Sequence, residues 1–190
     1  MKLKVYLSNG SILDFVLTDF SAEQDIVAEI NEGRLFSGKS LILGSRESCT
    51  MLQSVWISRI DIVSSAPLVV PRTLEGTMTL IENDDEFQKR AMQAKLQHRE
   101  GVTPGEAFEG FLQFSLAGNH RLMLSIQGVL RDQLQFFTNL RRAFETPFMW
   151  FGHPAGGLII LNVANVLSIS SVPGFSQYPR GSLLVDPAGQ

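Results

Sequence analysis

The sequence predicts an α+β protein that is mostly β, built from two related modules of ββαββ or small-barrel type. Three features carry this prediction: short stretches in which apolar and polar residues alternate, turn-forming dipeptides between them, and few segments with helical spacing. The alternating stretches recur in both halves of the 190-residue chain. Because repeated patterns point to repeated units, we place one β-rich module at 1–66 and the second at 106–173.

The first module is expected to open with a hairpin around Asn9-Gly10, because apolar residues alternate on both sides of this dipeptide. Asn-Gly between such runs favours a type I′ turn, in which both residues take a positive φ. Residues 22–32 have the spacing of an amphipathic helix. A strand in "LILGS", a hairpin around "GSRESCT" and a closing strand within 55–65 are expected to follow.

The second module repeats this order. A hairpin is expected around Gln127-Gly128, and Thr138 precedes a short helical pattern that Pro147 ends by removing a backbone donor. A closing strand is expected within 161–171. A further hairpin is expected at 117–119, where Ala-Gly-Asn interrupts two apolar runs.

The two closing segments both end in Ser-Ser, and alignment on these ends puts Ile57 on Val163 and Ile60 on Val166. The resemblance is one of pattern more than of letters. Chance alternation in two β-rich segments is the alternative explanation, because short apolar runs are ambiguous.

Between the modules we expect a linker at 67–105 that contains a helix over about 83–100. Asn83 stands where an N-cap is needed, with Glu86 three residues later, and acidic residues fill the first turn. The apolar face of this helix is narrow, which is typical of a helix on a surface or between domains. The last residues, 174–190, are rich in Pro and Gly and predict a flexible tail.

The stretch "GRLFSGKS" matches the phosphate-loop pattern through Gly33, Gly38, Lys39 and Ser40. A working phosphate loop is entered by a buried strand and left by a helix. Here the predicted order is reversed, with a helix before the motif and a strand after it. We therefore interpret Gly33 as a helix C-cap and Gly38 with Lys39 as a turn into a strand.

Composition restricts the function classes. The chain is 44% hydrophobic and 18% charged, with a formal net charge of −3, which argues against nucleic-acid binding by a general positive field. No apolar run approaches the roughly 18 residues of a membrane span, so no membrane partner is expected. The single cysteine cannot form an internal disulfide, so we expect a cytoplasmic location.

Residues that carry chemistry are few and scattered. The histidines are His98, His120 and His153, and none has a second histidine or a cysteine at ligand spacing. Cys49 has no basic residue beside it that would lower its pKa, so an ordinary thiol is expected. We predict no catalytic residues, no metal and no cofactor.

The aromatic residues near the ends of the modules offer a candidate partner surface. Phe148, Trp150 and Phe151 lie in the dense stretch "PFMWFG", and Trp56 alternates with its apolar neighbours in a predicted strand. Core packing is the ordinary role of such a patch, and a surface that binds a partner is the functional alternative.

The first hairpin resembles the opening motif of Sm-like proteins, which are small RNA-binding barrels. The residues that match are Val5, Leu7, Asn9, Gly10, Leu17 and Phe20. The resemblance implies a strongly bent, small barrel. The chain has Phe15 where the family has a strand-bending glycine, and Ser21 where the family has the aspartate that begins its RNA loop.

From these features we expect a non-enzymatic binding or assembly module of unknown partner, which acts through a protein partner or through self-association by exposed strand edges. Two alternatives stay open. One is a nucleotide-binding enzyme that uses Lys39 and Ser40, and the other is nucleic-acid binding of the Sm-like kind.

Overall fold

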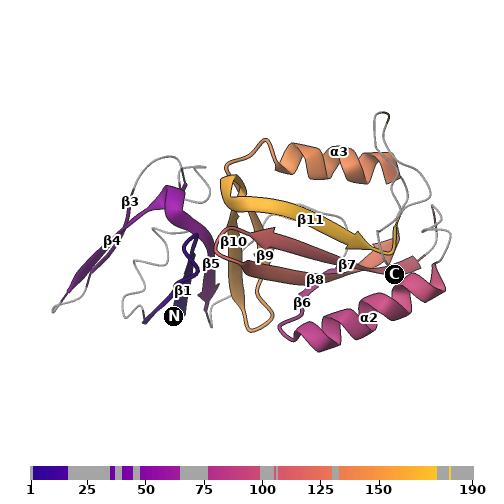
Figure 1. Cartoon of the computed structure of the whole chain (residues 1–190), viewed down its shortest axis with the longest axis horizontal. Coiled ribbons are helices and arrows are strands. Elements are labelled where there is room, and N and C mark those ends of the chain that lie inside the picture. The colour runs from indigo at the N-terminus through magenta and orange to yellow at the C-terminus, as the bar shows by residue number, and fades with distance from the viewer. Residues whose placement is uncertain are drawn as a thin grey trace.

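The fold is α+β and mostly β, as the sequence predicts. In Figure 1 a narrow hairpin projects at one end of the molecule, a first sheet stands next to it, and a second sheet runs to the other end between two helices. The computed structural model describes residues 2–16, 35–36, 40–44, 48–64, 77–98, 105, 107–129, 133–174 and 180.

The first sheet has five antiparallel strands in the order β2-β1-β5-β10-β9. The strands are β1 (Lys2–Leu7), β2 (Ile12–Val16), β5 (Ile57–Val63), β9 (Phe148–Gly152) and β10 (Gly157–Asn162). Strand β5 comes from the first half of the chain and β10 from the second, so the two halves share one sheet. The module boundaries at 66 and 106 stay a prediction.

The second sheet has four antiparallel strands in the order β11-β7-β8-β6. These are β6 (Thr77–Leu80), β7 (Ala107–Leu116), β8 (His120–Val129) and β11 (Val166–Val172). The β7–β8 hairpin turns at 117–119, as predicted, and Gly118 and Asn119 take the positive φ that the tight turn requires.

The projecting hairpin pairs β3 (Ser40–Gly44) with β4 (Cys49–Gln53), which confirms the strand expected in "LILGS" and the hairpin after it. Its side chains alternate strictly between half-buried and exposed positions. Leu41, Leu43 and Leu52 are on the half-buried face and pack against the core of the first sheet. The other face is turned outward.

Two helices lie on opposite sides of the second sheet in Figure 1. Helix α2 (Asp84–Gln97) confirms the helix predicted over about 83–100, and the Asn83 side chain accepts a hydrogen bond from the Glu86 backbone amide at 2.9 Å, the predicted cap. Phe87 and Ala91 are buried beneath it against Phe111 of β7.

Helix α3 (Gln133–Ala143) begins earlier than the sequence predicts. Thr138 is therefore inside the helix and does not precede it. The helix ends at Ala143, before the predicted stop at Pro147. Just beyond its end, the Thr146 hydroxyl donates to the Ala143 carbonyl at 2.7 Å.

Two apolar cores lie on either side of the first sheet. We call the first the N-core; it consists of Leu3, Val5, Ile57, Ile60, Ile62, Leu158 and Ile160. We call the second the C-core; it consists of Leu112, Phe114, Leu116, Leu122, Leu124, Ile126, Met149, Phe151, Ile159 and Leu161. Successive residues of β10 alternate between the two cores because side chains along a strand point to opposite faces.

The first hairpin turns at Asn9-Gly10 as predicted, but the turn is not of type I′. Gly10 has a φ of 91°, whereas Asn119 is the only non-glycine residue with a positive φ among the described residues. The loop is longer than two residues: Leu7 N donates to Ser11 O, and the Asn9 side chain accepts from Ser11 N. The hydrogen bond from Ser11 N to the Asn9 side chain thus stabilises a turn in which only Gly10 has a positive φ.

Three other sequence predictions were wrong in position. Strand β8 runs straight through Gln127-Gly128, which pair with β6 and β7 and do not form a turn. Trp56 is in a short 3-10 turn, η1 (Ser54–Trp56), and not in a strand. A second such turn, η2 (Val163–Asn165), precedes β11, so Ile57 and Val166 both begin strands and the alignment of Ile57 with Val163 is shifted by three residues.

Candidate functional site

The centre of the molecule is the antiparallel pairing of β5 with β10. Ile60 is opposite Ile160, and Ile62 is opposite Leu158. All four side chains are at most 4% exposed and belong to the N-core. Burial of an aliphatic side chain contributes about 1.5–3 kcal/mol, so this pairing is a tight apolar contact between the two halves.

Two asparagines close one end of this pairing. Asn162, at the end of β10, donates its side-chain amide to the carbonyls of Ser54 and Ile57 at 3.2 and 2.9 Å. Asn165, in η2, donates to the carbonyls of Val55 and Ile57, both at 2.9 Å. These bonds join the end of β10 and η2 to backbone carbonyls of η1 and of Ile57, the first residue of β5.

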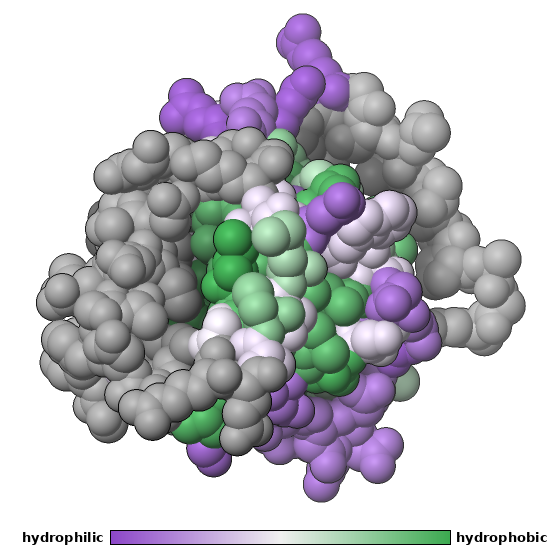
Figure 2. Space-filling view, turned by 90° about the vertical axis from the view of Figure 1, so that its left-hand side faces the viewer, coloured by the Kyte–Doolittle hydropathy of each residue, from purple (hydrophilic) through white to green (hydrophobic). Residues whose placement is uncertain are grey.

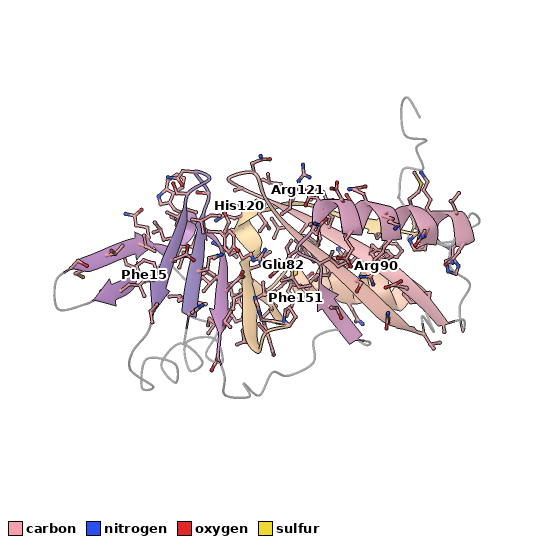
Figure 3. All side chains as sticks on the ribbon, turned by 90° about the horizontal axis from the view of Figure 1, so that it is seen from below. Phe15, Glu82, Arg90, His120, Arg121 and Phe151 are labelled. Carbon is pink, nitrogen blue, oxygen red and sulfur yellow. The ribbon has the colours of Figure 1, made fainter. Side chains whose placement is uncertain are left out.

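A buried ion pair lies on the opposite face of β5. Arg59 and Asp61 form two hydrogen bonds, of 2.6 and 2.7 Å, and both residues are at most 6% exposed. Arg59 also donates to the Arg121 carbonyl at 3.2 Å and lies 4.6 Å from the centre of the Tyr6 ring. The pair therefore links the first sheet to β8, where Figure 3 shows Arg121 beside His120.

Tyr6 and His120 complete this polar contact. The Tyr6 hydroxyl donates to Asp61 at 3.1 Å, and the Tyr6 and His120 rings meet edge to face at 5.3 Å. A ring nitrogen of His120 lies 2.8 Å from the Leu7 carbonyl. Burial raises the pKa of the Tyr6 phenol well above its usual range, which keeps it a protonated donor.

An open cleft of about 860 Å³ adjoins this network. Its lining carries charges of both signs. Arg59 is paired with Asp61, Arg121 lies 3.3 Å from Asp84, and Lys4 lies 3.8 Å from Asp14. Lys2 and Glu82 also line the cleft, so its charges are mixed and do not favour a ligand of one sign.

The hairpin at the end of the molecule exposes an apolar surface. Ile42 and Met51 are opposite each other on its outward face and are 58% and 63% exposed. Val55 and Trp56 of η1 are exposed to a similar degree. Figure 2 looks onto this end and shows hydrophobic surface gathered at the centre of the face. We call Ile42, Met51, Val55 and Trp56 the hairpin patch.

Strands β4 and β11 are two of the described strands that have an open edge. Among the strands that the structure describes, β4 pairs only with β3, and β11 pairs only with β7. Leu167 of β11 is 70% exposed. An unpaired edge presents backbone donors and acceptors to any strand that approaches it.

The predicted aromatic surface is divided by the fold. Trp56 is 60% exposed and belongs to the hairpin patch. Phe151 is buried in the C-core, and Phe148 and Trp150 are half-buried against the N-core. Trp150 and Phe151 thus pack against different cores, because successive side chains of β9 point to opposite faces of the sheet.

Of the predicted phosphate-loop residues, only Ser40 is among the described residues, and it begins strand β3. Gly33, Gly38 and Lys39 lie outside them, as does the predicted helix at 22–32. The nucleotide-binding alternative required a helix to begin at this point, and the strand lacks the amide-lined start that a helix offers to phosphate.

The histidines and the cysteine are dispersed. Cys49 is the first residue of β4 and is exposed, and His153 is in the β9–β10 turn, where its ring accepts from the Ala155 amide. The described part of the chain holds no group of three potential metal ligands. It also contains no helix with the length and hydrophobicity needed to cross a membrane.

Sequence reasoning missed Ile42 and Met51, the two central residues of the hairpin patch. The available signal was "SLILG", in which three apolar residues follow one another. Successive side chains of a strand point to opposite faces, so when Leu41 and Leu43 face the core, Ile42 between them faces outward. That reading would have found Ile42.

Comparisons with known proteins leave the site to be judged by its geometry. No family model matches the chain, and neither a curated protein nor a solved structure is significantly similar to it.

Proposed function

We propose that this protein is a non-enzymatic assembly module that associates with further copies of itself through open strand edges. The observation that carries the proposal is the hairpin patch beside the unpaired edge of β4. Exposed apolar side chains that adjoin an open edge combine the two attractions on which strand addition depends: backbone hydrogen bonds and apolar burial.

The architecture supports assembly over catalysis. Every charged group that we described in the central network has a partner of opposite sign or a carbonyl, so the network holds the fold together. The hairpin, in contrast, extends away from the first sheet, as Figure 1 shows, and its outward face has no described element upon it. Natural proteins usually shorten, charge or cover such an edge when it is not used.

The experiment is sedimentation velocity over a concentration series from about 1 to 100 µM. The expected result is a weight-average mass that rises with concentration above the 21.0 kDa of one chain. Met51→Lys places a charge in the hairpin patch and should lower the association constant at least tenfold. A wild-type protein that stays monomeric over the whole series would refute the proposal.

Lys89→Ala provides a matched surface control, because Lys89 is exposed on α2, far from the hairpin patch. It should associate as the wild type does. Circular dichroism of all three proteins separates loss of association from loss of folding.

A further inference from the structure

Two stretches of the chain contain the same series of elements at one fixed spacing. Strand β4 ends at Gln53 and β10 ends at Asn162, and a three-residue 3-10 turn follows each of them. A seven-residue strand then begins at Ile57 in one case and at Val166 in the other. Both spacings, 162 − 53 and 166 − 57, equal 109 residues.

The strand pairings repeat as well. Strand β4 pairs with the strand before it, β3, and β10 pairs with the strand before it, β9. Strand β5 pairs with β1, and β11 pairs with β7, each the first strand of a hairpin. The positions of β4 and β5 in the first half are therefore those of β10 and β11 in the second.

Within the chain, the strand before the 3-10 turn of the second half, β10, pairs with the strand after the 3-10 turn of the first half, β5. The same contact between copies would pair β4, the counterpart of β10, with β11, the counterpart of β5. Among the described strands, both of these have an open outer edge, as β2, β3, β6 and β9 also do. The chain thus contains one such strand pairing, β10 with β5, and leaves the equivalent edges of β4 and β11 unpaired.

We propose that copies of this chain associate head to tail, with β4 of one copy pairing antiparallel to β11 of the next in the register of the internal β10–β5 pairing. This inference rests on the proposed self-association and adds the partner strand and the register.

The spacing of 109 residues specifies that register. The internal pair Ile160 with Ile60 corresponds to Met51 of one copy opposite Ile169 of the next. In the same way, the internal pair Leu158 with Ile62 corresponds to Cys49 opposite Ser171.

Exposure of the counterparts agrees with this assignment. Ile160 is fully buried, and Trp150, which is opposite it on β9, packs against the N-core. Their counterparts, Met51 and Ile42, are 63% and 58% exposed in the single chain. The first pair is covered by the N-core, whereas the second pair is open in the single chain, and the proposed pairing would place Ile169 of the next copy beside Met51.

The end of the strand has a matching polar group. Asn162 donates its side-chain amide to the carbonyl of Ser54 in the internal contact. Its counterpart is Gln53, whose side-chain oxygen accepts from the Trp56 indole at 3.2 Å. The amino group of Gln53 is suited to donate to the Val163 carbonyl of the next copy, the counterpart of Ser54.

When β4 of one copy pairs with β11 of the next, the first copy still has a free β11 edge and the second still has a free β4 edge. Each copy still offers β11 after its β4 is paired, so assembly continues until a ring closes or a filament forms. Pairing of β4 with β4, in contrast, would stop at a dimer.

The native cysteine makes the register testable, since residues directly opposite in antiparallel strands have Cα atoms about 4.5–5.5 Å apart, within disulfide range. Ser171→Cys should place a thiol opposite Cys49 of the next copy. Under mild oxidation we expect a ladder of disulfide-linked dimers, trimers and larger species on a non-reducing gel, which collapses to the monomer with reductant.

The matched control is Ser170→Cys, because its side chain points to the other face of β11 and cannot reach Cys49. It should give at least tenfold less linked product than Ser171→Cys. A mixture of the wild type with the double variant Cys49→Ser/Ser171→Cys should give linked dimers and nothing larger, since each chain then has one reactive edge.

Val16→Lys tests the alternative edge at β2, where Val16 is 73% exposed. Association that survives Met51→Lys and fails with Val16→Lys would overturn this inference and leave the proposed self-association intact. So would Cys49-to-Cys49 dimers in the wild type, or equal ladders from Ser170→Cys and Ser171→Cys. A wild type that is monomeric at all concentrations overturns both proposals together.

Discussion

The β5–β10 pairing and the open edge of β4 are two versions of one local arrangement, and they differ in whether a neighbour is present. Ile160 of β10 is 0% exposed, whereas Met51 at the corresponding place of β4 is 63% exposed. Both strands are followed by a 3-10 turn and a seven-residue strand. Ile160 is covered by the N-core, whereas Met51 is open in the single chain, and the proposed association would give Met51 a neighbouring strand.

The two regions should respond oppositely to substitution. Changes within the β5–β10 pairing should lower the free energy of unfolding of the single chain, because the contact is part of the fold. Changes at the hairpin patch should leave that free energy nearly constant and affect association alone. The following variants test this contrast, and stability is measured by urea unfolding at about 1 µM so that association contributes little.

Arg59→Ala should have the largest effect. It leaves the Asp61 carboxylate buried without its partner, and loss of one member of a buried ion pair typically costs about 3–5 kcal/mol. Lys4→Ala, which breaks the exposed ion pair with Asp14, should cost at most about 1 kcal/mol. Equal effects of the two variants would show that the Arg59–Asp61 pair does not hold the halves together.

Ile160→Ala should destabilise the chain by about 2–5 kcal/mol, because it removes buried methyl groups from the N-core and leaves a cavity. Leu167→Ala is the control on β11, where the side chain is 70% exposed, and it should change stability by at most about 0.5 kcal/mol. A small effect of Ile160→Ala would mean that β10 does not complete the core of the first sheet.

The parts of the fold that the sequence predicted well are those governed by local chemistry. The start of α2 follows from Asn83 and its acidic first turn, and the structure confirms both the cap and the helix. The turn at 117–119 follows from residues that tolerate a positive φ. In each case the interacting groups are within a few residues of one another.

The β5–β10 pairing could not be predicted in this way. Alternation of apolar residues identifies a strand but gives no information about its partner, and Ile60 and Ile160 are 100 residues apart. Tertiary pairing also overrides local turn signals, as at Gln127-Gly128, where two neighbouring strands keep β8 extended. Ile42 of the hairpin patch, in contrast, could have been found from its local run of apolar residues.

Gly118→Ala should destabilise the contact between the two hairpin turns by more than about 1 kcal/mol. Gly118 has a φ of 83°, which strains an alanine at this position. The added Cβ would lie 2.4 Å from the Leu7 carbonyl oxygen, so the two turns would have to move apart. Gly44→Ala is the matched control, because a Cβ at Gly44 meets no atom within 4 Å. Comparable losses from both variants would contradict a close approach at Gly118.

Tyr6→Phe should cost about 1 kcal/mol near neutral pH, since it removes the hydrogen bond to Asp61 and little apolar contact. The pKa of the Tyr6 phenol is raised in the folded chain, so the unfolded chain releases this proton first, from about pH 10 upward. Unfolding of the wild type is then favoured as the pH rises. The stability advantage of the wild type over Tyr6→Phe should therefore shrink between about pH 9 and 11, and a constant difference would contradict the raised pKa.

Met51→Ala should have the smallest effect on the single chain and sharpens the comparison most. The side chain is 63% exposed, so the free energy of unfolding should change by at most about 0.5 kcal/mol, in contrast to the large loss from Ile160→Ala at the corresponding place. Burial of such a side chain between copies would contribute about 1.5–3 kcal/mol, so sedimentation should show association weakened about tenfold or more. If Met51→Ala destabilised the single chain as Ile160→Ala does, the two strands would share one role in folding, and β4 would not be an edge kept for a second copy.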